Sequence, residues 1–161
     1  MAKKHKLPST PALRLLRARK VEFEALQYPY VDRGGTEASA AALELPLHHI
    51  VKTLVFEDQD RAPLVVLMHG DKHVSEKALA RELGKKSVSP CAPAVAEKHS
   101  GYRVGGTSPF GTKRDMAVYA ERSILALPWI VINGGARGVL VRISPEVLVD
   151  LLGVTPVDVA N

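Results

Sequence analysis

A seven-residue segment, Gly105-Gly106-Thr107-Ser108-Pro109-Phe110-Gly111, has the composition of a rigid loop that presents its backbone to a ligand. Its glycines permit positive φ angles and close approach of other groups, while its proline fixes one φ angle and removes one N–H donor. Such a loop exposes backbone N–H groups that suit an anion, or the oxyanion that develops during acyl transfer. Simple packing of a glycine-rich turn is the alternative interpretation.

A second glycine-rich segment, Asn133-Gly134-Gly135-Ala136-Arg137-Gly138, follows the apolar run at 129–132. We expect the apolar run to be a strand and the glycines to form a loop directly after it. Arg137 could hold a phosphate there or extend into solvent. Two glycine loops in a chain of 161 residues predict a ligand pocket built mainly from backbone.

Lys52 is unusual because its neighbours in the segment 50–56 are nearly all apolar. A lysine in a sheet can simply point outward from the polar face. The alternative is a cation that projects into a pocket, where it holds a phosphate or polarises a carbonyl. The sequence leaves both interpretations open.

Three other sequence patterns give weaker indications of a functional site than the glycine segments and Lys52 do. Gly106-x4-Gly111-Thr112-Lys113 resembles a phosphate-binding P-loop, but that motif needs lysine directly after the second glycine. His69 and His73 would bring two imidazoles to one metal only on a helix, and Gly70-Asp71 between them predicts a turn instead. The single cysteine, Cys91, is expected to be a packed apolar residue rather than a nucleophile. We therefore expect neither a metal nor a cofactor.

Composition and charge narrow the class of protein. We expect a flexible basic leader at 1–9 and a single domain at 10–161. The formal net charge of +5 favours a polyanionic partner, although a basic surface alone is also an ordinary finding. The sequence has no long apolar run and no apolar core of a signal peptide, and its lone cysteine allows no internal disulfide. These features predict a cytoplasmic protein without a membrane partner.

Hydrophobic periodicity and capping residues predict a mixture of helices and strands. Helices are expected at 10–20, 36–45, 75–84, 92–99 and 144–153, with a short helical turn at 46–50. Strands are expected at 21–28, 51–56, 62–68, 116–119, 129–132 and 139–143, the second and third forming a hairpin. Several connections have hairpin length, which favours a mixed or antiparallel α+β domain over regular βαβ crossovers.

Three segments in this order resemble the YbaK (EbsC) family, free-standing relatives of the editing domain of bacterial prolyl-tRNA synthetases. They are Val51-Lys52-Thr53-Leu54, Gly101 to Gly111, and Gly134-Gly135-Ala136-Arg137-Gly138. The resemblance extends from Thr10 to Asp158. It implies a mixed, largely antiparallel, barrel-like sheet surrounded by helices, and deacylation of mischarged tRNA, chiefly Cys-tRNA(Pro), with Cys-tRNA(Cys) left open as a second substrate.

The resemblance also implies roles for particular residues. Lys52 matches the family lysine near the terminal adenosine and its phosphate, and Gly105, Gly106, Thr107, Ser108 and Pro109 match the loop at the aminoacyl group. Substrate binding is expected from Tyr28, Phe110, Gly111, Gly134, Gly135 and Arg137, with the match at Tyr28 weaker than the others.

In the scheme that the resemblance implies, the thiolate of the substrate cysteine attacks its own carbonyl and expels the tRNA hydroxyl, forming a thiolactone. The protein would supply orientation, oxyanion donors and the charge of Lys52. The expected partners are the CCA end of aminoacyl-tRNA and, weakly, prolyl-tRNA synthetase, with no DNA. Two alternatives stay open: a deacylase of Ala- or Ser-tRNA that uses water, and a module that binds tRNA or a synthetase without catalysis.

Overall fold

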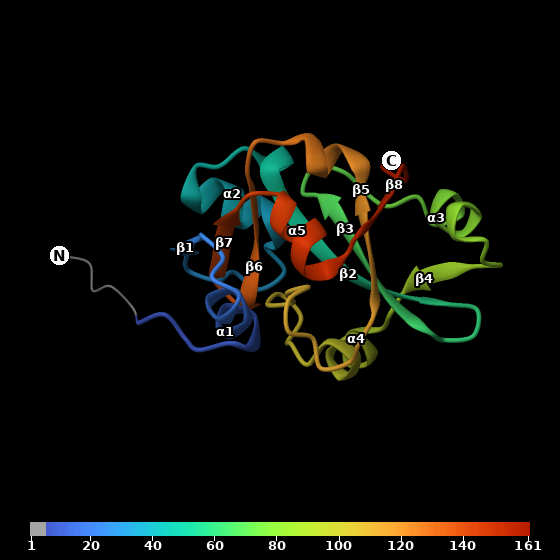
Figure 1. Cartoon of the computed structure of the whole chain (residues 1–161), viewed down its shortest axis with the longest axis horizontal. Coiled ribbons are helices and arrows are strands. Elements are labelled where there is room, and N and C mark those ends of the chain that lie inside the picture. The colour runs from blue at the N-terminus through green and yellow to red at the C-terminus, as the bar shows by residue number, and fades with distance from the viewer. Residues whose placement is uncertain (1–5) are drawn as a thin grey trace.

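The computed structural model describes residues 6–161, so the first part of the expected leader at 1–9 lies outside the described residues. The fold is one mixed sheet with helices around it (Figure 1). The strands are β1 (Glu24–Gln27), β2 (Ile50–Asp58), β3 (Pro63–His69), β4 (Val88–Pro90), β5 (Ala117–Glu121), β6 (Ile130–Ala136), β7 (Val139–Ile143) and β8 (Thr155–Val157). The helices are α1 (Pro11–Ala18), α2 (Gly35–Leu43), α3 (Glu76–Leu83), α4 (Pro93–Ser100) and α5 (Glu146–Leu152), with 3-10 turns η1 (Leu47–His49) and η2 (Arg122–Ala126).

The strands follow the order β1-β7-β6-β2-β3-β5-β8, and β4 pairs with β2 off this path. The pairings of β1 with β7, β6 with β7, β2 with β3 and β2 with β4 are antiparallel. Those of β2 with β6, β3 with β5 and β5 with β8 are parallel. The expected mixed, largely antiparallel sheet is therefore confirmed.

Strand β2 changes its neighbour along one edge. On the other edge it pairs with β3 from Val51 to Glu57. On the changing edge, β6 pairs with Ile50 and Val51, and β4 pairs with the segment from Phe56 to Asp58. Among residues 6–161, no strand pairs with 52–55 on this edge. The sheet therefore has an internal gap beside the centre of its longest strand.

Apolar side chains pack on both faces of the sheet because successive strand residues point to opposite sides. One cluster joins Val51 and Leu67 to Phe110 and to Leu13 of α1. Another joins Phe56, Leu64, Val66 and Met68 to Leu79 of α3. The two clusters pack on opposite faces of β2 and β3 and so keep the part of the sheet that contains the gap in place.

Helix α1 is joined to the sheet through its cap. The Thr10 hydroxyl accepts a hydrogen bond from Leu13 N over 3.0 Å and donates to the carbonyl oxygen of Gly134 over 2.6 Å. Threonine is a favoured N-cap, and Pro11 at the next position suits the first helical turn. One residue thus starts the helix and fixes β6.

Most predicted elements are present, with shifted ends. The strand expected at 21–28 is restricted to Glu24–Gln27. Strands β4 and β8 and the turn η2 were not predicted, because each is short and two of them contain proline. The prediction that Gly134 and Gly135 lie in a loop was wrong. They belong to β6, which continues to Ala136 through an irregularity in its pairing with β7.

Candidate functional site

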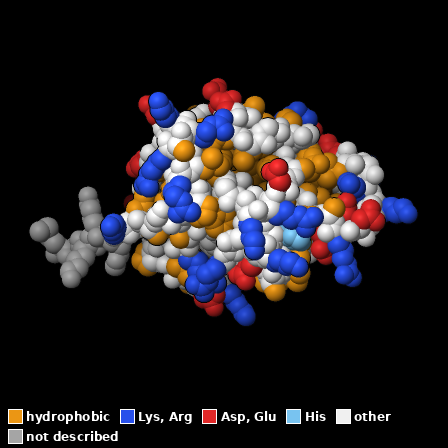
Figure 2. Space-filling model, turned by 60° about the horizontal axis from the view of Figure 1, so that its bottom comes forward, with side chains coloured by type: hydrophobic (Ala, Val, Ile, Leu, Met, Phe, Trp, Pro, Cys, Tyr) orange, Lys and Arg blue, Asp and Glu red, His pale blue; other side chains and the backbone are white. Residues whose placement is uncertain are grey.

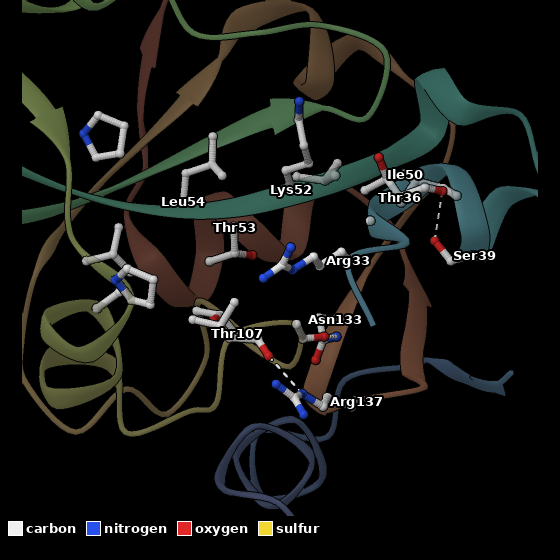
Figure 3. A pocket seen from close by; sticks show the side chains of 18 of the residues that line it. Arg33, Thr36, Ser39, Ile50, Lys52, Thr53, Leu54, Thr107, Asn133 and Arg137 are labelled. Carbon is white, nitrogen blue, oxygen red and sulfur yellow. Dashed lines mark hydrogen bonds between the residues drawn. The ribbon is translucent and has the colours of Figure 1, made fainter. Parts of the chain in front are cut away.

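A cavity of about 780 Å³ lies at the gap in the sheet (Figure 3). Its wall includes the β2 segment 52–55, together with Gly105, Thr107, Asn133 and Arg137. Residues from α2, α4 and the segments before them complete it, among them Tyr28, Tyr30, Arg33, Cys91 and Ala96. The cavity thus brings Lys52, Tyr28, Arg137 and part of the first glycine loop together around one strand edge.

The open edge of β2 directs main-chain groups into this cavity. Ile50 O accepts from Gly70 N and Asp58 N donates to Ala62 O, so the even-numbered residues turn their hydrogen-bonding groups toward β3. Val55 O accepts from Cys91 N over 3.0 Å, on the opposite edge. By the same alternation, the N–H and C=O of Thr53 face the gap.

The two glycine-rich segments are in direct contact. Asn133 Nδ2 donates to the carbonyl oxygen of Gly105 over 3.1 Å, and Arg137 Nε donates to the carbonyl oxygen of Val104 over 2.9 Å. A Cβ atom on Gly106 would lie 2.8 Å from Arg137 N, closer than van der Waals contact allows. Glycine is therefore required at 106 for the close approach of the two main chains.

Buried hydroxyl groups of Tyr102 and Ser108 fix the conformation of the first glycine loop. The Tyr102 hydroxyl donates to the carbonyl oxygen of Phe110 over 2.5 Å, and Phe110 N donates to Ser108 Oγ over 3.1 Å. Burial raises the pKa of Tyr102 to about 12, so the phenol keeps its proton. Ser108 and Phe110 are fully buried. Their contacts within the loop give it shape.

The predicted site residues therefore fall into two groups. Within residues 6–161, those that line the cavity are Tyr28, Lys52, Gly105, Thr107 and Arg137. Those outside its lining are Gly106, Ser108, Pro109, Phe110, Gly111, Gly134 and Gly135. Members of the second group support the wall. Gly135, for example, has a φ of +98°, and a Cβ there would lie 2.9 Å from the Tyr102 ring.

Lys52 and Thr53 point to opposite sides of β2, as successive strand residues must. In Figure 3 the Lys52 ammonium points away from Thr107, Asn133 and Arg137. It donates a hydrogen bond to the backbone carbonyl of Lys72. Partial burial lowers the pKa of Lys52, while the carboxylates of Asp71 and Glu37 act in the opposite direction. Lys52 is thus a half-buried cation at one end of the cavity.

Thr53 carries an unused hydrogen-bonding atom. Its hydroxyl oxygen is buried and has no partner, and it is the single such side-chain atom within residues 6–161. Figure 3 shows this side chain directed toward Arg33 and Thr107, across the cavity. A buried hydroxyl without a partner is costly, and because this oxygen has almost no accessible surface, a ligand in the cavity could bond to it only if the Thr53 side chain or its neighbours shift.

Three cavity residues were not identified from the sequence. They are Tyr30, Arg33 and Asn133. The Tyr30 ring lies under Arg137, with its centre 4.8 Å from the guanidinium carbon, and the Tyr30 hydroxyl would be 2.6 Å from a Cβ on Gly105. Arg33 lines the cavity just before α2. Asn133 was seen only as part of a glycine segment, yet its amide connects to Gly105. The segment 30–33 gave no signal besides an aromatic and a basic residue in a turn.

His48 and His69 form a hydrogen-bonded network outside the cavity lining, whereas His73 lines the cavity. His69 is buried, with Nδ1 2.7 Å from the carbonyl oxygen of His48 and Nε2 2.7 Å from Ser123 Oγ. His48 stacks on it with ring centres 3.8 Å apart and planes 7° apart, and lies 2.9 Å from Asp71. These three side chains could supply metal ligands by proximity. However, an imidazole holds a metal in its own plane, and two stacked rings do not share a plane. This arrangement fits a hydrogen-bonded network better than a metal centre.

Cys91 lines the cavity as a protonated thiol. Burial is the main cause that raises its pKa, and the charge of Glu57 adds to it. A raised pKa disfavours the thiolate that a cysteine nucleophile needs. The residue therefore contributes a small apolar surface to the wall.

Residues 33–151 match the aminoacyl-tRNA editing domain family. The chain is 29% identical over 152 residues to EbsC of Enterococcus faecalis, provisionally assigned as a Cys-tRNA(Pro)/Cys-tRNA(Cys) deacylase, covering 94% of this chain and 93% of that protein. It is 29% identical over 92 residues to a proline–tRNA ligase of Limosilactobacillus fermentum, which covers 55% of this chain and 16% of the ligase.

The fold also matches solved structures. A crystal structure of a provisionally assigned trans-editing enzyme for prolyl-tRNA synthetase superposes with a TM-score of 0.83 at 23% identity, covering 96% of this chain and 99% of that one. Within residues 6–161, no helix has the length and apolar character that a membrane crossing requires. With the matched region extending from α2 into α5, this chain belongs to the aminoacyl-tRNA editing domain family.

Proposed function

We propose that this protein removes the amino acid from mischarged tRNA, with Cys-tRNA(Pro) as its main substrate, and that the CCA end enters the cavity beside β2. The observation that carries the proposal is the open edge of β2 opposite Gly105 and Thr107, in a chain of the editing-domain family. The relative EbsC supports the choice of cysteine. The net charge of +5 suits a polyanionic substrate.

The two sides of β2 would bind different parts of the substrate. Lys52 would hold the phosphate of the terminal adenosine on its side of the strand. The aminoacyl ester would lie on the other side, where Thr53, Gly105 and Thr107 line the cavity. This division explains why the lysine and the glycine loop do not converge on a single atom.

In the proposed reaction, the substrate thiolate attacks the carbonyl carbon of its own ester. A carbon–sulfur bond forms, the carbon–oxygen bond to the ribose breaks, and the ribose oxygen leaves with a proton from solvent. The protein contributes orientation of the thiolate and stabilisation of the oxyanion by backbone N–H groups of the glycine loop. The protonated Cys91 leaves the nucleophilic role to the substrate.

A deacylation panel tests this proposal. The protein is incubated with Cys-, Ser- and Ala-tRNA(Pro), which differ in the side chain alone. We expect Cys-tRNA(Pro) to be cleaved at least tenfold faster than Ser-tRNA(Pro), with a cysteine thiolactone trapped early in the reaction. Equal rates for cysteine and serine would overturn thiol assistance and favour water as the nucleophile. Binding of all three without turnover would instead indicate a non-catalytic tRNA module.

We also propose that the protein works in the cytoplasm beside prolyl-tRNA synthetase. Support comes from the similarity to part of a proline–tRNA ligase. Sedimentation of the protein with a synthetase of the same class, with and without tRNA(Pro), tests this association. A complex is expected with tRNA present, and its absence under both conditions would contradict the proposal.

A further inference from the structure

A second hollow, of about 360 Å³, lies between α3 and β4. Its lining includes four basic side chains: Lys77, Arg81, Lys85 and Lys86. Glu76 lines both this hollow and the larger cavity beside β2, so the two lie close to each other at the start of α3. We call this hollow the α3–β4 groove.

Local structure explains why these cations face one groove. Ser75 caps α3 by accepting a hydrogen bond from Ala78 N over 3.2 Å. Lys77 and Arg81 are four residues apart and therefore lie on the same face of the helix. Gly84 ends the helix in the left-handed conformation, with a φ of +66°, and the chain then returns toward β4.

The groove keeps an excess of positive charge. Lys85 Nζ lies 3.0 Å from Asp58 Oδ2, so this charge is neutralised. Lys77, Arg81 and Lys86 form no ion pair within residues 6–161, and all three are exposed. Glu76 is the single acidic residue of the lining. Other Lys and Arg side chains are scattered over the face in Figure 2, but this group lies beside Glu76, which also lines the candidate site.

We infer that the α3–β4 groove binds the sugar–phosphate backbone of the nucleotides that precede the aminoacylated adenosine. This inference rests on the proposed function. Lys52 shares one face of β2 with Leu54 and Phe56, whose cluster includes Leu79 of α3, so its ammonium lies on the side of β2 that α3 covers. A strand leaving the cavity past Glu76 would meet Lys77, Arg81 and Lys86 in turn. Backbone contacts of this kind position a nucleic acid without reading its sequence.

The test compares two triple variants. The first is Lys77→Gln/Arg81→Gln/Lys86→Gln, which removes three charges from the groove. The matched control is Lys6→Gln/Arg19→Gln/Lys20→Gln, which removes three exposed charges near α1. Each is assayed for kcat/KM with full-length Cys-tRNA(Pro) and with 3′-cysteinyl adenosine, at 50 and 200 mM salt. Binding of uncharged tRNA is measured by anisotropy at the same salt concentrations.

Each phosphate contact adds about 0.7–0.9 to the slope of log affinity against log salt, so three contacts amount to roughly a 20- to 40-fold change over this fourfold range of salt. We expect the groove variant to lose this part of the salt dependence with tRNA and to cleave cysteinyl adenosine at the wild-type rate. The control variant should keep the wild-type slope.

Two results would overturn the inference: a wild-type salt slope in the groove variant, or an equal loss in both variants. Failure of the proposed deacylase function would be detected by a different measurement, the cleavage assay with the wild-type protein. In that case the wild-type protein cleaves neither substrate, while the anisotropy data still decide whether the groove binds tRNA.

Discussion

Gly106 lies so close to Arg137 that a Cβ atom on the glycine would sit 2.8 Å from the backbone nitrogen of the arginine. Both partners in this contact are main chain, so no side-chain rotation can relieve the overlap. The relative position of the two glycine-rich segments thus depends on one missing methyl group.

Gly106→Ala is expected to separate the two segments and to lower deacylation at least tenfold, since small displacements of a reacting group reduce rates strongly. The measurement is single-turnover cleavage of Cys-tRNA(Pro). Gly84→Ala is the control, because a Cβ there meets nothing within 4 Å although its φ is +66°. It should cost about 1 kcal/mol of stability and leave activity intact. Full activity of Gly106→Ala would contradict the proposed role.

Tyr102→Phe should destabilise the protein by about 1–3 kcal/mol, because the buried carbonyl of Phe110 loses its donor. Urea denaturation measures the change in unfolding free energy. Activity should fall as well, because the loop that begins at Gly105 loses an anchor. An unchanged midpoint would mean that the hydroxyl does not hold the loop.

Thr53→Val is expected to keep or raise the free energy of unfolding, by up to about 1 kcal/mol, because it removes a buried hydroxyl that has no partner. Deacylation should nevertheless fall about tenfold, the value of one modest hydrogen bond to the substrate. Thr53→Ser restores the hydroxyl and should recover most of the rate. If valine leaves the rate unchanged, the hydroxyl does not contact the substrate.

Lys52→Ala should reduce kcat/KM for Cys-tRNA(Pro) by about 10²–10³, the usual effect of losing one charged contact in a site of this type. The fold should be retained, because the ammonium bonds to a backbone carbonyl, that of Lys72, and the stem is half-buried. Lys72→Ala, which leaves that carbonyl in place, is the matched control. A folded Lys52→Ala protein with wild-type activity would remove Lys52 from the site.

Stability should fall as the pH decreases from 7 toward 5. Burial is the main cause that lowers the pKa of both His69 and His99 in the folded protein. The unfolded chain therefore takes up protons at a higher pH than the folded chain does, which favours unfolding by up to about 1.4 kcal/mol per pH unit for each histidine. Urea titrations at pH 7, 6 and 5 measure this slope. An NMR titration in which His69 shows its ordinary pKa would contradict the assignment.

Local signals made much of the fold predictable. Thr10-Pro11 marked the start of α1, and Ser75 and Gly84 marked both ends of α3. Strands β4 and β8 were missed because each has three residues, too few to show an alternating hydrophobic pattern. They form through pairing with strands distant in the sequence. Gly134 and Gly135 were assigned to a loop from composition. Their place in β6 depends on β7 and on the Thr10 cap, which local patterns do not reveal.

The candidate site was predictable in its parts and not in its arrangement. Lys52 and the first glycine loop were identified, and the cavity contains Lys52, Gly105 and Thr107. The gap that they border follows from where β6 ends and β4 begins, and the side from which Lys52 projects follows from the alternation of residues along β2. Arg33 and Tyr30 enter through tertiary packing alone, so their sequence context gave no indication of a role.

Because β2 exchanges β6 for β4 along one edge, the sheet has a gap there, and the amide and carbonyl of Thr53 face that gap. An occupant of that gap is recognised through its own polar skeleton, much as a strand recognises an adjoining strand. Replacement of the surrounding side chains would then change which amino acid is accepted, while the backbone contacts to the ester would stay the same.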